Sequence, residues 1–589
     1  MPIINRRHFL TGSSISLGTA GLLHAMPAWA RGAHGGMAAR KGSDVLAGEH
    51  ITMTVADATL STGRRSGPAV TVNGTIPGPL VRLREGQNLV VDLVNNSTDE
   101  TSIHWHGLLL PFLMDGVPGV TMAAVQPGET FRYEFPIRQA GTYWWHAHTL
   151  QEPLGHYGPI VIDPATPDHS RHYDREYVLM LSDWSPMHPH TIMRKLKLGE
   201  AYFNYDKTSA ADDYPLSGAD RRMWARMRMM PTDIADVTGS TYSYLINGHG
   251  PEDGLELAYE PGERIRLRII NGSAMTFFNV RIPGLAMTVI AADGQDVQPV
   301  EVDEFQIGNA ETYDVLVEPQ GPDAFAFVAE AMDRSGMGVA MLASRSGARA
   351  EVPPLRSPPL LAMADMGMNH ASGMEGMDHG SMDGESPGGA GSSGGMDMRG
   401  MSMRDTSLLP DYVDAGPGVD MVAMNPVDRM DFPGLGLDDV GHRVLNYRQL
   451  KTAQPNPDHR RPTRLREIHL TGNMERYMWS FDGKKFSAVT DDPIRFAFNE
   501  RVRVRLVNDT MMAHPIHLHG HFFELVNGHD GFQPLKHTLI VQPGGSATFD
   551  LTANEPGDWA FHCHLMYHMH SGMFQVVTVR PLQGTGDDR

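Results

Sequence analysis

Apolar and polar residues alternate in several short runs along the chain. The clearest runs cover residues 84–95, 261–271 and 500–508, and each ends at an asparagine. Alternation of this kind predicts β-strands with one buried face. Because the runs resemble one another and lie far apart, they predict three copies of one β-rich unit, which suits a chain of 589 residues.

A longer repeat relates the two ends of the chain. Residues 125–128 and 541–544 both have the sequence Val-Gln-Pro-Gly, and in each copy the glutamine precedes a histidine by 20 residues, at His146 and His562. We therefore expect the first and last units to share one design. Short strands with regular turns favour β-sandwiches.

Four histidine pairs have the spacing His-x-His. They are His104 and His106, His146 and His148, His517 and His519, and His562 and His564. On a strand, alternate residues point to one face, so each pair can present two imidazoles together. One such pair can arise by chance, whereas four in one chain indicate a metal centre.

The last pair encloses Cys563, the only cysteine in the chain, so no internal disulfide can form. If residues 559–564 form a strand, Cys563 faces away from His562 and His564, and one short piece of backbone joins two metal sites. A copper site with one thiolate, two imidazoles and one weak thioether needs Cys, two His and Met. Cys563, His568 and Met573 supply three of these four ligands; the alternative is a buried free cysteine near surface histidines.

Together these motifs resemble those of the multicopper oxidases. The resemblance implies a cofactor of four copper ions. Its type 1 copper would take His514, Cys563, His568 and Met573; its type 2 copper His104 and His517; and its two type 3 coppers His106, His146, His148, His519, His562 and His564. Each end of the chain supplies four trinuclear ligands, so the cluster would lie between the first and last domains.

The same resemblance implies an all-β fold of three cupredoxin-like Greek-key sandwiches. We expect these domains at residues 45–165, 172–350 and 441–582, with a disordered methionine-rich insert within 355–440. The middle copy has no His-x-His pair and is interpreted as structural. Ala147 occupies the place of the cysteine in the first copy, which argues against a type 1 copper there.

Electrons would pass from the type 1 copper through Cys563 and its histidine neighbours to the trinuclear cluster, where four of them reduce O₂ to water. Protons must also arrive, and a nearby carboxylate is a natural source. Asp115 matches the acidic residue that follows the first His-x-His pair in related oxidases, as a proton relay or as a turn aspartate. Met569 stands where several relatives that oxidise Cu(I) carry Glu. If that Glu helps to deliver protons, another group must do so in this chain; alternatively, Met569 is a packing residue.

Residues 363–403 contain ten methionines with Gly, Ser, Asp and His, and too few large apolar residues for a core. Thioether sulfur suits Cu(I), so the segment is a candidate for Cu(I) capture, the alternative being a passive linker. The candidate ligands are Met366, Met368, Met374, Met377, His379 and Met382. With the phrases at residues 106–119 and 472–479, the segment resembles the bacterial copper-resistance protein A group.

Residues 1–30 resemble an export signal. Arg6 and Arg7 fit a twin-arginine motif, an apolar stretch follows, and residues 28–30 (Ala-Trp-Ala) are a candidate cleavage site; an ordinary secretory signal is the alternative. The expected location is the periplasm, with the twin-arginine export machinery and other periplasmic copper-handling proteins as partners and no membrane span in the mature chain. The net charge of −20 disfavours nucleic acid and attracts cations.

Two weaker candidate sites remain. Met223, Met227 and Met230 have helical spacing and form either a face near a copper entrance or a core stripe. Residues 187–190 (Met-His-Pro-His) form either an additional copper site or a solvated loop.

The sequence thus predicts a periplasmic oxidase of Cu(I) that uses O₂ and serves copper tolerance. Three alternatives stay open. They are a laccase-like oxidase of phenols, a copper store or carrier that turns over little O₂, and a redox-inert structural relative.

Overall fold

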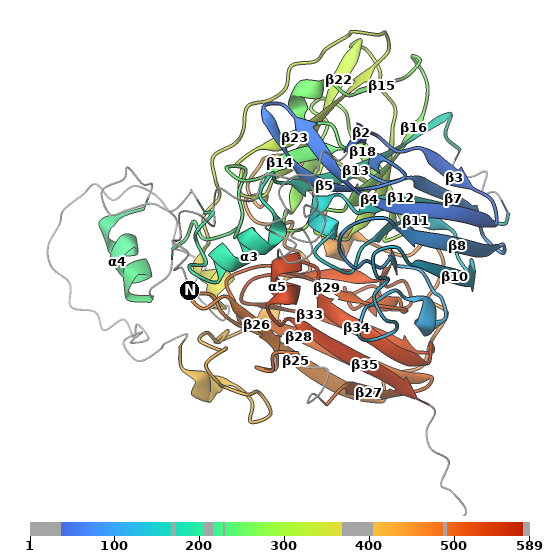
Figure 1. Ribbon diagram of the computed structural model, residues 1–589. Helices are drawn as coiled ribbons and strands as arrows, with labels where there is room; N and C mark the ends of the chain where they lie inside the picture. Colours follow the sequence, from blue (N-terminus) through green and yellow to red (C-terminus); the bar gives the residue numbers. More distant parts are fainter. Residues whose placement is uncertain are drawn as a thin grey trace, which may run out of the picture.

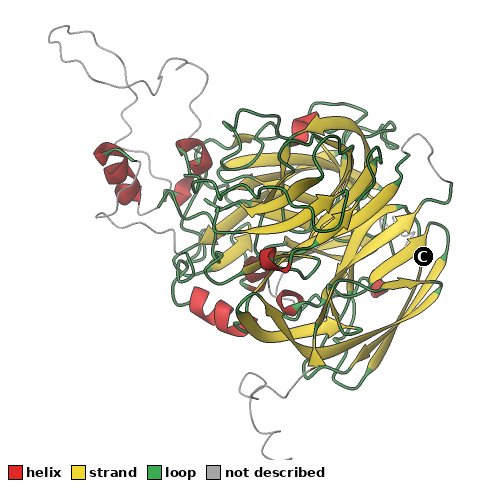
Figure 2. Ribbon diagram, turned by 90° about the horizontal axis from the view of Figure 1, so that it is seen from above, coloured by secondary structure: helices red, strands yellow, loops and turns green. Residues whose placement is uncertain are grey.

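The computed structural model describes residues 37–166, 172–204, 216–227, 230–367, 404–486 and 492–580. Strands dominate this part of the chain, and its helices are short (Figure 2). The strands form six sheets in three pairs, one pair per domain (Figure 1). The predicted fold of three cupredoxin-like β-sandwiches is confirmed. The proposed export signal and residues 368–403 lie outside the described residues.

The first domain packs a seven-stranded sheet, in the order β10-β8-β4-β5-β6-β2 with β1 beside β4, against a five-stranded sheet in the order β3-β7-β12-β11-β9. Its strands are β1 Met37–Ala38, β2 Arg40–Lys41, β3 Val45–Ala47, β4 His50–Thr62, β5 Arg65–Val72, β6 Thr75–Ile76, β7 Leu80–Arg84, β8 Asn88–Asn95, β9 His104–His106, β10 Thr130–Pro136, β11 Gly141–His146 and β12 Tyr157–Asp163.

The middle domain has sheets in the orders β14-β13-β16-β21-β18-β19 and β15-β23-β22-β17-β20. Its strands are β13 Arg175–Trp184, β14 Ser243–Ile246, β15 Glu256–Ala258, β16 Ile265–Asn271, β17 Phe278–Arg281, β18 Met287–Ala292, β19 Gln295–Val302, β20 Glu304–Ile307, β21 Thr312–Val317, β22 Ala324–Ala331 and β23 Met337–Ala343. Two helices, α3 Pro189–Leu196 and α4 Gly218–Met227, belong to the long connection between β13 and β14.

The last domain has sheets in the orders β26-β25-β28-β33-β30-β31, with β24 beside β33, and β27-β35-β34-β29-β32. Its strands are β24 Val427–Asp428, β25 Arg464–Asn473, β26 Met478–Phe481, β27 Ile494–Ala497, β28 Glu500–Asn508, β29 His514–Leu518, β30 Phe523–Leu525, β31 Leu535–Lys536, β32 Thr538–Val541, β33 Gly545–Ala553, β34 Gly557–Cys563 and β35 Phe574–Arg580. Helix α5, Met566–His570, connects β34 to β35.

The three alternating runs form equivalent strands, namely β8, β16 and β28. Each runs parallel to the first long strand of its domain and antiparallel to a later one. In β8 the alternate residues Leu89, Val91 and Leu93 are fully buried, as one core-facing side of a strand requires. The repeat in the sequence is therefore a repeat of structure.

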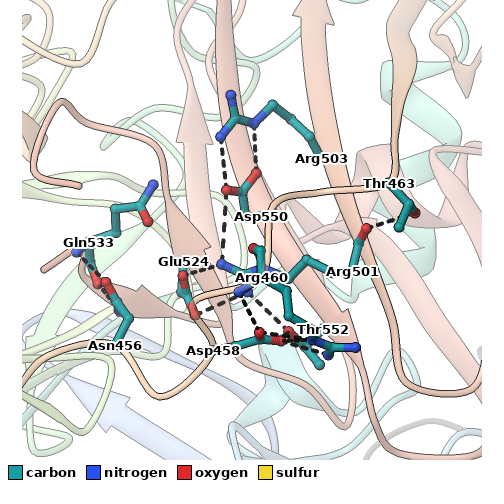
Figure 3. A network of polar contacts seen from close by, with 10 residues as sticks. All are labelled: Asn456, Asp458, Arg460, Thr463, Arg501, Arg503, Glu524, Gln533, Asp550 and Thr552. Carbon is teal, nitrogen blue, oxygen red and sulfur yellow. Dashed lines mark hydrogen bonds and ion pairs between the residues drawn. The ribbon is translucent and has the colours of Figure 1, made fainter. Parts of the chain in front are cut away.

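The outer faces of two equivalent sheets have different neighbours. In the middle domain, buried Arg268 donates to Thr142 of the first domain at 2.8 Å, so this face docks onto that domain. In the last domain, Arg501 pairs with Glu524 and Arg503 with Asp550 (Figure 3). These four residues line an open groove. These guanidinium groups already have carboxylate partners, so we assign no ligand to the groove.

No helix of the described residues is long and apolar enough to cross a membrane.

Candidate metal centre

Paired strands bring the predicted trinuclear histidines together between the first and last domains. In the first domain β9 and β11 place His104 opposite His146, and in the last domain β29 and β34 place His517 opposite His562. The two halves meet face to face: the ring centroids of His104 and His519 lie 3.8 Å apart, as do those of His106 and His517. All eight imidazoles, which are His104, His106, His146, His148, His517, His519, His562 and His564, are buried.

Burial favours the neutral form of seven of these imidazoles, namely His106, His146, His148, His517, His519, His562 and His564. Desolvation, reinforced by the neighbouring histidines, lowers the pKa of His106, His146 and His517 well below its usual value. The pKa of His562 falls to about 3, also mainly through desolvation. Neutral imidazole is the form that binds a metal ion, because its free nitrogen carries a lone pair.

Several ring nitrogens in this cluster have no hydrogen-bond partner among the described residues. They are His104 Nε2, His106 Nδ1, His146 Nε2, His517 Nε2 and His564 Nε2. Buried polar atoms are rarely left unpaired. Moreover, His562 Nε2 lies 3.3 Å from His148 Nε2 and 3.0 Å from His519 Nε2, so nitrogens from both domains converge. This donor set fits bound copper, for which imidazole is a good ligand.

Carboxylates and carbonyls hold the opposite ring nitrogens. His104 Nδ1 donates to the carbonyl oxygen of Asp115 at 2.8 Å, and His519 Nδ1 donates to the Asp115 carboxylate at 2.8 Å. Glu152 Oε2 lies 2.7 Å from His146 Nδ1, and burial raises the pKa of this carboxyl well above its usual value. Such outer contacts fix the tautomer and orientation of a ligating histidine. No motif in the sequence points to Glu152.

A second cluster contains Cys563 and two of its predicted partners. Cys563 Sγ lies 3.5 Å from His514 Nδ1 and 3.9 Å from His568 Nδ1, and the two ring nitrogens are 3.3 Å apart. Met573 is fully buried, and its carbonyl accepts a hydrogen bond from the Cys563 amide at 3.1 Å. Burial raises the pKa of the thiol, so a bound metal ion would be needed to stabilise the thiolate. As predicted, Cys563 faces away from the trinuclear cluster.

The middle domain also reaches this second cluster. Asp236 Oδ2 lies 2.7 Å from His568 Nε2 and accepts a hydrogen bond from Tyr477 at 2.8 Å. Burial raises the pKa of Asp236 to about 7, and Trp479 stacks on the His568 ring. The interpretation of the middle copy as purely structural is therefore incomplete, although the histidine and cysteine clusters of the described residues contain no middle-domain residue.

A small cavity adjoins this cluster, where the middle and last domains meet. Its volume is about 20 Å³, and Met275, Met332 and Met512 line it with the carboxylate-bearing Asp236 and Asp333. The wall also contains Ala513 and Leu565, which are chain neighbours of the copper-ligand candidates His514 and His564. Three methionines and two aspartates are thus among the residues that line a space beside the Cys563 cluster.

The weaker predicted positions have varied surroundings. Met569 packs against Val117, Ala560 and Phe574, which agrees with a packing role. Met366 is fully buried at the end of the 3₁₀ turn Met363–Met366, so it is not presented to solvent for copper capture. The remaining capture candidates, Met368, Met374, Met377, His379 and Met382, lie outside the described residues.

Residues 187–190, predicted to form either a copper site or a solvated loop, lie across the beginning of helix α3. His188 caps α3 by accepting from the His190 amide, and the two rings stack with centroids 5.3 Å apart. Helix α4 contains Met223 and Met227, whose side chains are outside the described part of the structure, and Met230 beyond its end is exposed.

Comparison with known proteins agrees with this geometry. Three multicopper oxidase family models match residues 54–167, 175–346 and 459–583. Copper resistance protein A of Escherichia coli is 44% identical over 98% of this chain and 99% of its own length. The multicopper oxidase MmcO of Mycobacterium tuberculosis is 31% identical over 97% and 95% of the two chains.

Solved structures share the fold at lower identity. The laccase from Botrytis aclada has a TM-score of 0.58 and 21% identity, covering 92% of this chain and 88% of its own. A multicopper oxidase from Campylobacter jejuni, described as a metallo-oxidase, has a TM-score of 0.57 and 17% identity, covering 93% and 96%. A laccase and a metallo-oxidase are thus equally similar in fold. From its sequence and its copper-site residues, this chain belongs to the multicopper oxidases, oxidoreductases that use O₂, and to their copper resistance protein A group.

Proposed function

We propose that this chain is a periplasmic oxidase of Cu(I) that serves copper resistance. The overall reaction would convert four Cu(I), one O₂ and four protons into four Cu(II) and two waters. The observation that carries the proposal is the methionine-lined cavity beside the Cys563 cluster. Thioether ligands favour Cu(I), and oxygen ligands favour harder ions such as the product Cu(II).

The copper assignment follows the clusters in the structure. His514, Cys563, His568 and Met573 would hold type 1 copper. His104 and His517 would hold type 2 copper, and the other six clustered histidines the type 3 pair. Bound copper would supply one-electron redox chemistry and the site of O₂ reduction. The protein holds the imidazoles neutral and oriented, and β34 links the two clusters through adjacent residues.

Asp236 connects the cavity to the Cys563 cluster. Its carboxylate lines the cavity and is hydrogen-bonded to His568 at 2.7 Å. A Cu(I) ion held there would lie one side chain away from a type 1 ligand. This short path would favour electron transfer without any contact between the substrate and the buried thiol of Cys563.

The size of the cavity favours a metal ion over a phenol. A volume of about 20 Å³ is close to that of one water-sized sphere. A phenol ring would have to displace several buried side chains before reaching this position. The laccase-like alternative therefore requires another approach to the Cys563 cluster.

A paired substitution tests the proposal. Met275→Leu with Met332→Leu keeps the side-chain volume but removes two thioethers. We expect catalytic efficiency with Cu(I) to fall about 10-fold or more, because an ion loses two soft ligands. Oxygen uptake with an organic electron donor should be retained. Met287→Leu, at a fully buried methionine outside the cavity wall, is the matched control. Unchanged efficiency with Cu(I) in the double variant would reject the cavity as the substrate site.

Export by the twin-arginine route is part of the proposal. The Arg6-Arg7 motif supports it. Replacing both arginines by lysine should leave the chain in the cytoplasm, as cell fractionation would show. Normal export of that variant would indicate the ordinary secretory signal instead.

A further inference from the structure

A group of fully buried charges joins the middle domain to the last domain. Lys536 Nζ of the last domain lies 3.0 Å from Asp293 Oδ2 and 2.9 Å from Glu311 Oε1, both of the middle domain. All three side chains are 0% exposed. Burying such charges is costly unless each is paired and hydrogen-bonded. Their place next to the trinuclear histidines raises the question of what the group does there.

Asp293 binds backbone as well as Lys536. Its Oδ2 accepts hydrogen bonds from the amides of His537 at 3.2 Å and Thr538 at 3.1 Å, and its Oδ1 accepts from the Thr312 amide at 3.1 Å. Asp293 lies in the turn between β18 and β19 at a φ of 47°, which Asp tolerates better than most residues. The turn therefore directs this carboxylate at the backbone where β31 passes into β32.

That backbone in turn contacts two copper-ligand candidates. The carbonyl of His537 accepts from His517 Nδ1 at 2.7 Å, which leaves His517 Nε2 free for a metal ion. Thr538 Oγ1 lies 3.2 Å from His106 Nε2, which leaves His106 Nδ1 free. Contacts of this kind decide which nitrogen a histidine presents.

His537 contributes a third imidazole beside those of His106 and His517. One of its ring nitrogens lies within 4.8 Å of one ring nitrogen of His106 and one of His517. It is buried, and its Nε2 has no partner among the described residues. A shift of the His537 backbone would therefore move an imidazole as well as a carbonyl against the cluster.

We propose that Asp293 is a positioning residue for the trinuclear copper site. It fixes residues 537–538 so that His517 and His106 present the correct nitrogens, and Lys536 pairs with the Asp293 carboxylate at 3.0 Å. This role rests on the proposed copper assignment. It gives the middle domain, which supplies no ligand, a direct part in building the centre.

Three variants of the full-length chain distinguish this positioning role from the alternative, in which the buried charges only stabilise the contact between the middle and last domains. Asp293→Ala removes all three of these backbone hydrogen bonds. Asp293→Asn keeps one side-chain carbonyl oxygen. This oxygen can accept hydrogen bonds either from the Thr312 amide or from the amides of residues 537–538, but not from both sides. Glu311→Gln is the matched control, because it removes a charge from the same buried group but does not touch that backbone.

The measurement is a Cu(II) titration of the metal-free chains, followed by type 2 electron paramagnetic resonance, total copper and blue absorption. We expect Asp293→Ala to weaken type 2 copper binding about 10- to 100-fold. Asp293→Asn should show a smaller loss, and Glu311→Gln should match the wild type. Blue absorption should persist in all three and report that they are folded.

Other results would overturn the proposal. Equal losses of type 2 copper in Asp293→Asn and Glu311→Gln would show that the buried charges only tie the domains together, and this pair decides the question if Asp293→Ala does not fold. Wild-type type 2 spectra and affinity in both Asp293 variants would reject the role directly. A wild-type chain that took up blue copper but no type 2 copper would overturn the trinuclear assignment and this role with it.

Discussion

The hairpin β11–β12 of the first domain and the hairpin β34–β35 of the last domain are built alike but differ in what lies behind their histidines. In each hairpin the first strand leads into a His-x-His pair that belongs to the histidine cluster between the two domains. Behind the pair in the last domain lie Cys563 and His514, and the Cys563 amide donates to the Met573 carbonyl. The corresponding positions in the first domain are held by other residues.

In the first domain, Ala147 takes the place of the cysteine, and its amide donates to the carbonyl of His156. Thr101, three residues before His104, takes the place of His514, and its hydroxyl lies 3.1 Å from His156 Nδ1. Gln151 contacts the same nitrogen at 3.1 Å. Thr101, Gln151 and His156 thus contact one another behind this hairpin. Each of the two hairpins thus contributes one His-x-His pair to the histidine cluster between the domains. The Cys563 cluster, by contrast, depends on a few side chains that only the last domain has behind its hairpin.

The largest expected effect comes from making the last hairpin like the first. Cys563→Ala should abolish the intense blue thiolate absorption, because no other cysteine exists in the chain. Oxygen uptake with Cu(I) should fall to background, while circular dichroism should still show a folded β protein. Persistence of the blue colour would contradict the type 1 assignment.

Removal of one trinuclear imidazole should separate the two clusters. His517→Ala is expected to abolish O₂ reduction and spare the blue absorption, because His517 belongs to the histidine cluster shared by both hairpins and not to the Cys563 cluster. Rapid reduction of the blue copper by Cu(I), without reoxidation by O₂, would be the spectroscopic sign. Wild-type oxygen uptake would contradict the assignment.

A smaller effect is expected for Asp115, whose carboxylate contacts one histidine of the first domain and one of the last domain. Asp115→Asn keeps the shape of a side chain that accepts from His519 and lies 3.3 Å from His104 Nδ1, but it removes the charge. We expect oxygen uptake to fall about 10- to 100-fold, with the blue absorption unchanged. If Asp115 also relays protons, the loss should vary with pH. Unchanged uptake at every pH would reject both roles.

The smallest effect is expected from the reverse change, in which the first hairpin receives a cysteine at the position equivalent to Cys563. Ala147→Cys places a thiol at the position equivalent to Cys563, at a cost of about 1–3 kcal/mol for overpacking a buried site. No second blue band should appear, because Thr101 replaces a histidine there. A second thiolate copper band in absorption would show that the surrounding residues matter less than we argue.

Much of this architecture could be predicted from the sequence. The alternating runs gave β8, β16 and β28, and the His-x-His pairs gave the residues that meet between the first and last domains. Both patterns are local, because strand alternation fixes which neighbouring residues share a face. The opposite orientations of Cys563 and its flanking histidines follow from the same rule.

The outer contacts could not be predicted in this way. Asp236 and Asp293 lie hundreds of residues from the histidines they act on, in a domain without a ligand motif. Their roles depend on how the domains pack. The prediction that Met366 captures Cu(I) is wrong for a related reason. The composition around Met366 is typical of a solvated segment, but tertiary contacts bury its side chain. A deletion of the methionine-rich segment should therefore be limited to residues 368–403.

The most direct test of the account is oxygen uptake by the purified, copper-loaded protein with Cu(I) as the sole electron donor. We predict rapid uptake with four Cu(I) oxidised for each O₂ and no release of peroxide, and largely the same stoichiometry when residues 368–403 are deleted. Full copper loading without oxygen uptake would contradict the oxidase proposal and support a copper store or carrier.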